Sequence, residues 1–207
     1  MRLTAKPTFW LILCPALSLI SSCQKEIDNS DPGTGNTNTI IGQYNFVGTM
    51  ASTYSSVIVS SQGSELKAIT VSDYVTQNNV GTATITASDI VFTGVGYSVD
   101  TTANTKTYID GGLVDESDLP FVLTAPPANS TNPYTRINND SLSVIGALGV
   151  PNPSGATPTG PIGVKISWSG DTLLLKVASS FTQNVSQGGV PGVLTGTVNG
   201  VAKLKKR

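Results

Sequence analysis

The sequence predicts an all-β domain, folded as an antiparallel up-and-down barrel or, alternatively, as a β-sandwich. From Ile40 onward, short apolar stretches rich in Thr, Val and Ile are interrupted every ten or so residues by Gly, Pro, Asn and Asp. Several of these stretches alternate strictly between apolar and polar side chains, as half-buried strands do, and no long helical period appears. We therefore expect about eight to ten short strands with tight connections.

Four stretches carry the alternation before residue 130. In each, the apolar residues are expected on one face of a strand. They are Tyr44, Phe46 and Met50, opposite Asn45 and Thr49; Ala83, Ile85 and Ala87; Val95, Tyr97 and Val99; and Leu119, Phe121 and Leu123.

The clearest hairpin joins a strand over residues 162–168 to one over residues 173–177 through the turn Ser-Gly-Asp. Asp110, Gly111 and Gly112 predict a second hairpin, because Asp and Gly tolerate the positive φ of a tight primed turn. Residues 124–133 and 149–161 are rich in Pro, Asn and Gly and are expected to be loops. The second is long enough to lie over the mouth of a barrel or to mediate a contact.

The first 22 residues have the pattern of a secretory signal. Arg2 and Lys6 precede an apolar run from Phe9 to Ile20, which is shorter than the ~20 residues of a membrane-spanning helix. Residues 23–39 are polar and predict a flexible tether, and residues 40–207 form the expected all-β domain.

Ile20, Ser21, Ser22 and Cys23 resemble the lipobox of bacterial lipoproteins. The resemblance implies that Cys23 is alkylated by a diacylglyceryl group, becomes the first mature residue and carries acyl chains such as palmitate that hold the protein to a membrane. The alternative is an unmodified cysteine in a plain signal peptide.

Residues 24–28, Gln-Lys-Glu-Ile-Asp, resemble the acidic export signal that follows the lipidated cysteine in surface lipoproteins of the Bacteroidota type. This resemblance implies an outer-membrane lipoprotein that faces the cell surface. A solvated tether that faces the periplasm is the alternative.

The composition argues against several functions. Without the leader, ten basic residues stand against thirteen acidic ones, a balance of −3, and four of the ten lie between Lys203 and Arg207, so the body does not attract nucleic acid. Histidine is absent and no cysteine follows Cys23, which removes the usual general bases, nucleophile partners and zinc ligands. Asp115, Glu116 and Asp118 form an acidic cluster in an expected loop, with too few fixed ligands for calcium. We expect no enzyme, no metal and no cofactor.

The start of the first strand, Ile41 to Phe46, and the Gly-Asp-Thr-Leu-Leu-Leu stretch from Gly170 resemble lipocalin-like domains, with Tyr44 where that family usually has Trp. This resemblance implies a barrel whose cavity holds a small hydrophobic ligand. The candidate lining residues are Tyr44, Phe46, Tyr97, Phe121 and Trp168. The alternative for all five is ordinary core packing.

A second function stays open: an interaction module of a surface complex that contacts a protein partner or a glycan through its loops. Thr101, Ser141 and Thr172 each follow an Asp and resemble the O-glycosylation sites of exported Bacteroidota proteins. The sequences around Asp140 and Asp171 are also explained as turns, because the Asp side chain accepts backbone N–H bonds there.

Overall fold

The structure of the chain is a computed structural model. It describes residues 39–146, 148 and 160–207. Residues 1–38 lie outside these ranges, and with them the predicted leader, the predicted lipidation site at Cys23 and almost all of the predicted tether. So does the expected loop over 149–161, except for its last two positions.

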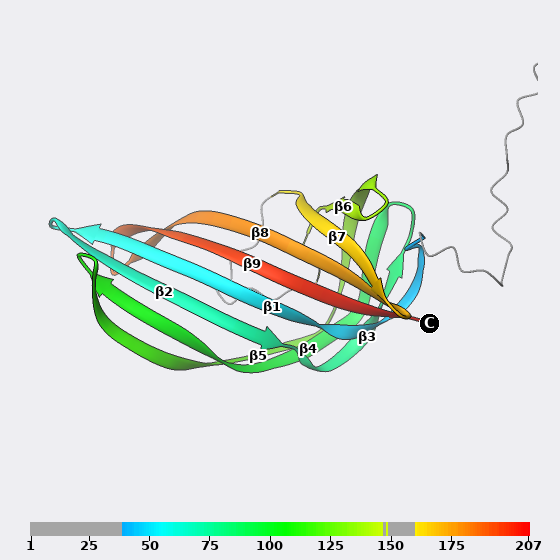
Figure 1. Cartoon of the computed structure of the whole chain (residues 1–207), viewed down its shortest axis with the longest axis horizontal. Coiled ribbons are helices and arrows are strands. Elements are labelled where there is room, and N and C mark those ends of the chain that lie inside the picture. Colours follow the sequence, from blue (N-terminus) through cyan, green and yellow to red (C-terminus); the bar gives the residue numbers. More distant parts are fainter. Residues whose placement is uncertain (1–38, 147, 149–159) are drawn as a thin grey trace, which may run out of the picture. The chain divides into compact units, whose positions relative to one another are not determined.

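The described residues form nine strands in one antiparallel sheet (Figure 1). The order of pairing is β2-β1-β3-β4-β5-β6-β7-β8-β9, and β9 also pairs with β1, so that the hydrogen bonding runs in a ring. This confirms the predicted all-β, antiparallel, up-and-down class. The strands are β1 (Gly42–Ser61), β2 (Ser64–Val75), β3 (Gln77–Ile85), β4 (Asp89–Ile109), β5 (Gly112–Asn138), β6 (Ser141–Val144), β7 (Ile162–Ser169), β8 (Thr172–Gln187) and β9 (Val190–Lys206).

The ring closes at one end of the sheet. There β1 pairs with β3 over residues 42–45, and the short strands β6 and β7 connect β5 to β8. We call this the closed end. Beyond the closed end the partner of β1 changes from β3 to β2, and β2 in turn pairs with β4. In the part of the chain that the structure describes, this second region is a six-stranded sheet ordered β8-β9-β1-β2-β4-β5, which we call the open part.

The core lies inside the closed end. Apolar side chains from eight strands fill it, and each large side chain removed from water contributes about 1.5–3 kcal/mol. The largest fully buried members are Tyr44, Phe92, Ile85, Ile90, Leu142, Leu173, Leu175 and Leu204. We call the side of the sheet that carries these residues the inner face, along the whole length of the strands.

A β-bulge between Phe46 and Gly48 changes which side chains of β1 face inward. Before the bulge Tyr44 and Phe46 point into the core, whereas after it Thr49 is 1% exposed and Met50 is 41% exposed. The prediction that Met50 shares a face with Phe46 is therefore wrong, because the extra residue of a bulge shifts the two-residue period by one.

Polar side chains complete the backbone bonding where β1 changes its neighbour. Thr76 N–H donates to the Thr49 carbonyl (2.8 Å) and its hydroxyl accepts from Thr49 N–H (2.7 Å). The Asn79 amide donates to the Thr76 carbonyl (3.0 Å). Gly48 has a φ of +141°, and a Cβ there would lie 2.7 Å from the Asn79 Nδ2 atom, so this junction requires glycine.

Both predicted hairpin turns are confirmed. Gly170 has a φ of +60° between β7 and β8, and Asp110 and Gly111 have φ of +50° and +81° between β4 and β5. Ala87, by contrast, is exposed in the connection between β3 and β4 rather than on a strand face.

The prediction of a loop over residues 124–133 is wrong. These residues form part of the 27-residue strand β5. Within the described residues, β5 pairs with β4 on one side and with β6 only from Tyr134 onward. Pro120, Pro126, Pro127 and Pro133 are therefore tolerated, because a strand edge without a partner needs no N–H donor. The acidic residues Asp115, Glu116 and Asp118 also belong to β5 rather than to a loop.

Replacement of Gly81 by alanine is expected to lower the free energy of unfolding in urea by about 2–4 kcal/mol. Gly81 has a φ of +101°, and an added Cβ would lie 2.6 Å from backbone atoms of Gly94 and Val95, at the bulge between β3 and β4. The matched control is Gly163→Ala in β7, where an added Cβ meets nothing within 4 Å. Equal effects of the two substitutions would contradict this account.

Candidate functional site

A second apolar cluster lies on the inner face of the open part. Ala51, Tyr74 and Val99 are buried, and Tyr97, Phe121 and Leu123 pack against them half-buried. Strand pairing brings these side chains together: Tyr74 lies opposite Ala51, and Leu123 lies opposite Val99. The Tyr74 and Phe121 rings are 6.1 Å apart at an interplanar angle of 50°.

The five residues predicted to line a cavity fall into two groups. Tyr44 and Phe46 are buried in the core of the closed end, and half-buried Trp168 packs against that core with its ring 6.4 Å from Tyr44. Phe121 belongs to the second cluster. Tyr97 contacts both groups, with its ring 6.3 Å from Phe46, and so connects the core to the second cluster.

Tyr74 is a member of the second cluster that the sequence did not predict. In the segment from Val71 to Thr76, both sets of alternate positions contain apolar or aromatic residues, so the pattern does not identify the inner face. The face follows from the register between Tyr74 and Ala51, which only the fold provides.

The phenol groups of this region stay protonated. Burial raises the pKa of Tyr74 well above its ordinary value, and the neighbouring Tyr97 hydroxyl raises it further. Burial also raises the pKa of Tyr97. Both groups are therefore neutral at physiological pH and can act as hydrogen-bond donors beside apolar surface.

Hydroxyl side chains continue the inner face toward the far end of the open part. Thr53 donates to the Ser72 carbonyl (3.2 Å), and the hydroxyls of Thr70 and Thr105 are 3.2 Å apart. The Ser72 hydroxyl is buried without a hydrogen-bond partner among the described residues. Apart from Asp115, the described inner-face positions of the open part carry no charged side chain, whereas Lys67, Lys106 and Glu116 alternate onto the opposite, outer face.

Two acidic residues of β5, Glu116 and Asp118, contact side chains of β4. Glu116 forms an ion pair with Lys106 (3.2 Å), and the Asn104 amide donates to Glu116 (3.3 Å) and Asp118 (2.9 Å). In the part of the chain that the structure describes, no group of three or more His, Cys, Asp or Glu side chains is arranged to hold a metal ion.

The three hydroxyls that resemble O-glycosylation sites each have a hydrogen-bond partner. Thr101 donates to the Asp73 carbonyl (2.9 Å), Ser141 to the Asn138 side chain (2.6 Å) and Thr172 to the Asp171 carboxylate (3.2 Å). Asp140 and Asp171 do lie in turns. In the first turn the side chain that accepts a backbone N–H bond is Asn138, which accepts from Asp140 (3.0 Å), and not Asp140 as the sequence predicted.

Comparisons with known proteins give no family. No family model, no curated protein and no solved structure matches the chain. Over the described ranges, no helix has the length and apolar character that crossing a membrane requires.

Tyr44 provides a pH-dependent test of the core. Its hydroxyl donates to the Ile40 carbonyl (2.6 Å), and burial raises its pKa from 10.0 to about 12. Because the unfolded chain loses this proton first, the contribution of Tyr44 to stability is present below pH 10 and is lost as the pH rises toward 12. Tyr44→Phe should cost about 0.5–1.5 kcal/mol at neutral pH, and the difference from the wild type should narrow above pH 10 in urea titrations.

The control is Tyr54→Phe, which removes a hydroxyl from the exposed outer face of β1. A difference between wild type and Tyr44→Phe that is constant across this pH range would count against the assignment.

Proposed function

We propose that the chain is a non-catalytic, lipid-anchored protein of the bacterial outer membrane that binds a small hydrophobic ligand on the inner face of the open part. The observation that carries the proposal is the second apolar cluster. Its aromatic members Tyr97 and Phe121 are half-buried, in contrast to the fully buried Tyr44 in the core of the closed end.

The chemistry of the inner face favours an uncharged ligand. Ala51, Val99 and Leu123 offer apolar surface, and the Tyr97 phenol offers a neutral donor. A ligand with a charged group would lose its hydration there without an opposite charge to replace it. A ligand with an apolar body and a carbonyl, ester or ether oxygen fits this arrangement, in a lipocalin-like use of a β-barrel.

The anchor follows from the lipobox residues Ile20 to Cys23 and the following Gln-Lys-Glu-Ile-Asp stretch. A cysteine that carries acyl chains holds a protein to a membrane because each buried methylene contributes about 0.8 kcal/mol. Display on the cell surface is the favoured location, with the periplasmic face as the alternative.

The second candidate function is an interaction module, which the exposed surface of β5 favours. Leu119 and Val122 are 49% and 69% exposed on a strand whose edge has no partner before Tyr134 among the described residues. An edge of this kind can accept a strand from a protein partner.

Ligand binding is tested with Phe121→Ala in the full chain, extracted from its source cells in mild detergent and examined by native mass spectrometry. The wild type should carry an adduct that is lost on denaturation. Loss of the Phe121 ring should reduce occupancy about tenfold, the effect of ~1.4 kcal/mol of lost contact. The matched control, Val122→Ala, changes the next side chain, which points away from the cluster. Equal adduct on all three proteins, or none on the wild type, would contradict the ligand proposal and favour the interaction module.

The anchor is tested separately with Cys23→Ser. Metabolic labelling with palmitate should label the wild-type chain in the membrane fraction, and the variant should lose the label and leave that fraction. Ser22→Ala keeps a small residue before the cysteine and should retain both. A Cys23→Ser chain that remains labelled would refute lipidation at this residue.

A further inference from the structure

The outer face of the sheet carries a row of side chains that crosses five strands. Lys165 in β7 lies opposite Lys176 in β8, and Lys176 lies opposite Val201 in β9. Val201 lies opposite Met50 in β1, and Met50 lies opposite Val75 in β2. Partners in antiparallel strands point to the same face, so these five side chains form one continuous line.

Two acidic residues lie beside the far end of this line. Asp73 and Asp100 border a hollow of about 540 Å³ together with Met50, Val75 and Val201. Lys165 and Lys176 border a second hollow of about 540 Å³, and Asn199 and Val201 border both. We call the surface from Lys165 to Asp100 the outer band. It is basic at one end, apolar in the middle and acidic at the other.

Among the described residues, the charged side chains of the outer band form no ion pair with a group of opposite sign. The ion pairs found in the described part of the chain are Lys106 with Glu116 and Lys205 with Asp171, and neither involves the band. Lys165 and Lys176 are both exposed and directly opposed, an arrangement that costs stability unless an anion lies nearby.

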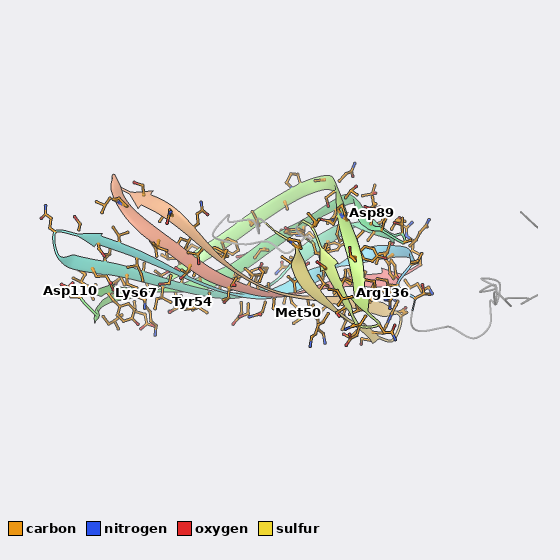
Figure 2. The ribbon with its side chains drawn as sticks, turned by 90° about the horizontal axis from the view of Figure 1, so that it is seen from above. Met50, Tyr54, Lys67, Asp89, Asp110 and Arg136 are labelled. Atoms are coloured by element: carbon orange, nitrogen blue, oxygen red, sulfur yellow. The ribbon has the colours of Figure 1, made fainter. Side chains whose placement is uncertain are left out.

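The middle of the band exposes large apolar side chains. Met50 is 41% exposed and Val75 58% exposed. Tyr54 and Val71, which lie opposite one another further along β1 and β2, continue this surface on the same face. Figure 2 shows Met50 and Tyr54 on one side of the sheet, with Lys67 further along. Exposed apolar residues that are contiguous and bordered by charges mark contact sites.

We propose that the occupant of the outer band is a second copy of this chain. A two-fold axis that runs parallel to the strands between β9 and β1 reverses the order of the row in the second copy. Lys165 of one copy then faces Asp100 of the other. In the same way Lys176 faces Val75 of the other copy, beside its Asp73, and Val201 faces its Met50. The alternative axis, across the strands, places lysine against lysine and is disfavoured by like-charge repulsion.

The next row agrees with this axis. Asn199 lies opposite Ser52, and Ser52 lies opposite Asp73. In the two-fold arrangement Asn199 meets Ser52 of the second copy, an amide against a hydroxyl. The strands of the two copies also run in the same direction, which suits face-to-face packing of twisted sheets and places Ile40 of both copies at the same end.

The outer face of the open part is broad. Its six strands from β8 to β5, at about 4.8 Å spacing, span about 24 Å, and β1 from Met50 to Ile58 spans about 27 Å. The product, about 650 Å², is of the same order as the ~800 Å² per partner of a stable protein interface.

Charge reversal across the two copies tests the proposal. In Lys165→Asp both contacts with Asp100 become acid against acid, and in Asp100→Lys both become base against base. Sedimentation of the full-length protein from cells, in mild detergent, should show a dimer for the wild type and about tenfold weaker association for each variant alone. An equal mixture of the two variants should recover association, because a mixed dimer again pairs an acid with a base at both contacts.

Recovery in the mixture cannot arise from a folding defect in either variant. Lys206→Asp, which makes the same change outside the band, is the control and should associate as the wild type does. A monomeric wild type, or variants that associate no better mixed than alone, would overturn the proposal. Flotation of a monomeric wild type with vesicles of anionic phospholipid, lost in Lys165→Asp, would assign the band to the membrane surface instead.

Discussion

The fold depends on a change of partner along one edge of β1, which pairs first with β3 and then with β2. Its other side pairs with β9 from Tyr44 to Val59, which closes the ring. On the first side β3 is the partner at the beginning and β2 from Met50 onward, so β2 and β3 occupy successive parts of the same edge. The bonds between Thr49 and Thr76 bridge the change of partner, where a regular ladder would leave backbone groups unsatisfied. The closed end and the open part both originate at this point.

The same junction determines the chemistry of both faces. The bulge before Gly48 shifts the alternation of β1 by one residue, which turns Ala51 and Thr53 inward and Met50 and Tyr54 outward. Without the extra residue Met50 would join the core and Thr49 would reach solvent. The position of Met50 and Tyr54 on the outer face and that of Ala51 and Thr53 on the inner face therefore both depend on one inserted residue.

The sequence allowed the class of fold and two turns to be predicted because the signals there are local. The alternation from Ile162 to Trp168 and the Asp-Gly turn at residue 110 depend only on nearby residues. Strand length was not predictable in this way. The second halves of β1 and β4 are rich in Ser and Thr, since the inner face of the open part accepts hydroxyls, and so they lack the apolar rhythm of a strand. The prolines of β5 led to the prediction of a loop. Only the pairing of β5 with its neighbours shows that it lies at an edge, where prolines are tolerated.

The candidate site could be predicted only in part for a related reason. Phe121 and Tyr97 were identified as aromatic residues on strand faces, but membership of the second cluster depends on the pairing of β2 with both β1 and β4. Tyr74 and Val75 are adjacent in the chain, yet one packs in that cluster and the other belongs to the outer band. Because neighbouring residues of a strand point to opposite faces, a substitution can change one surface without altering the other. The two faces of a single layer of strands can thus carry different chemistry.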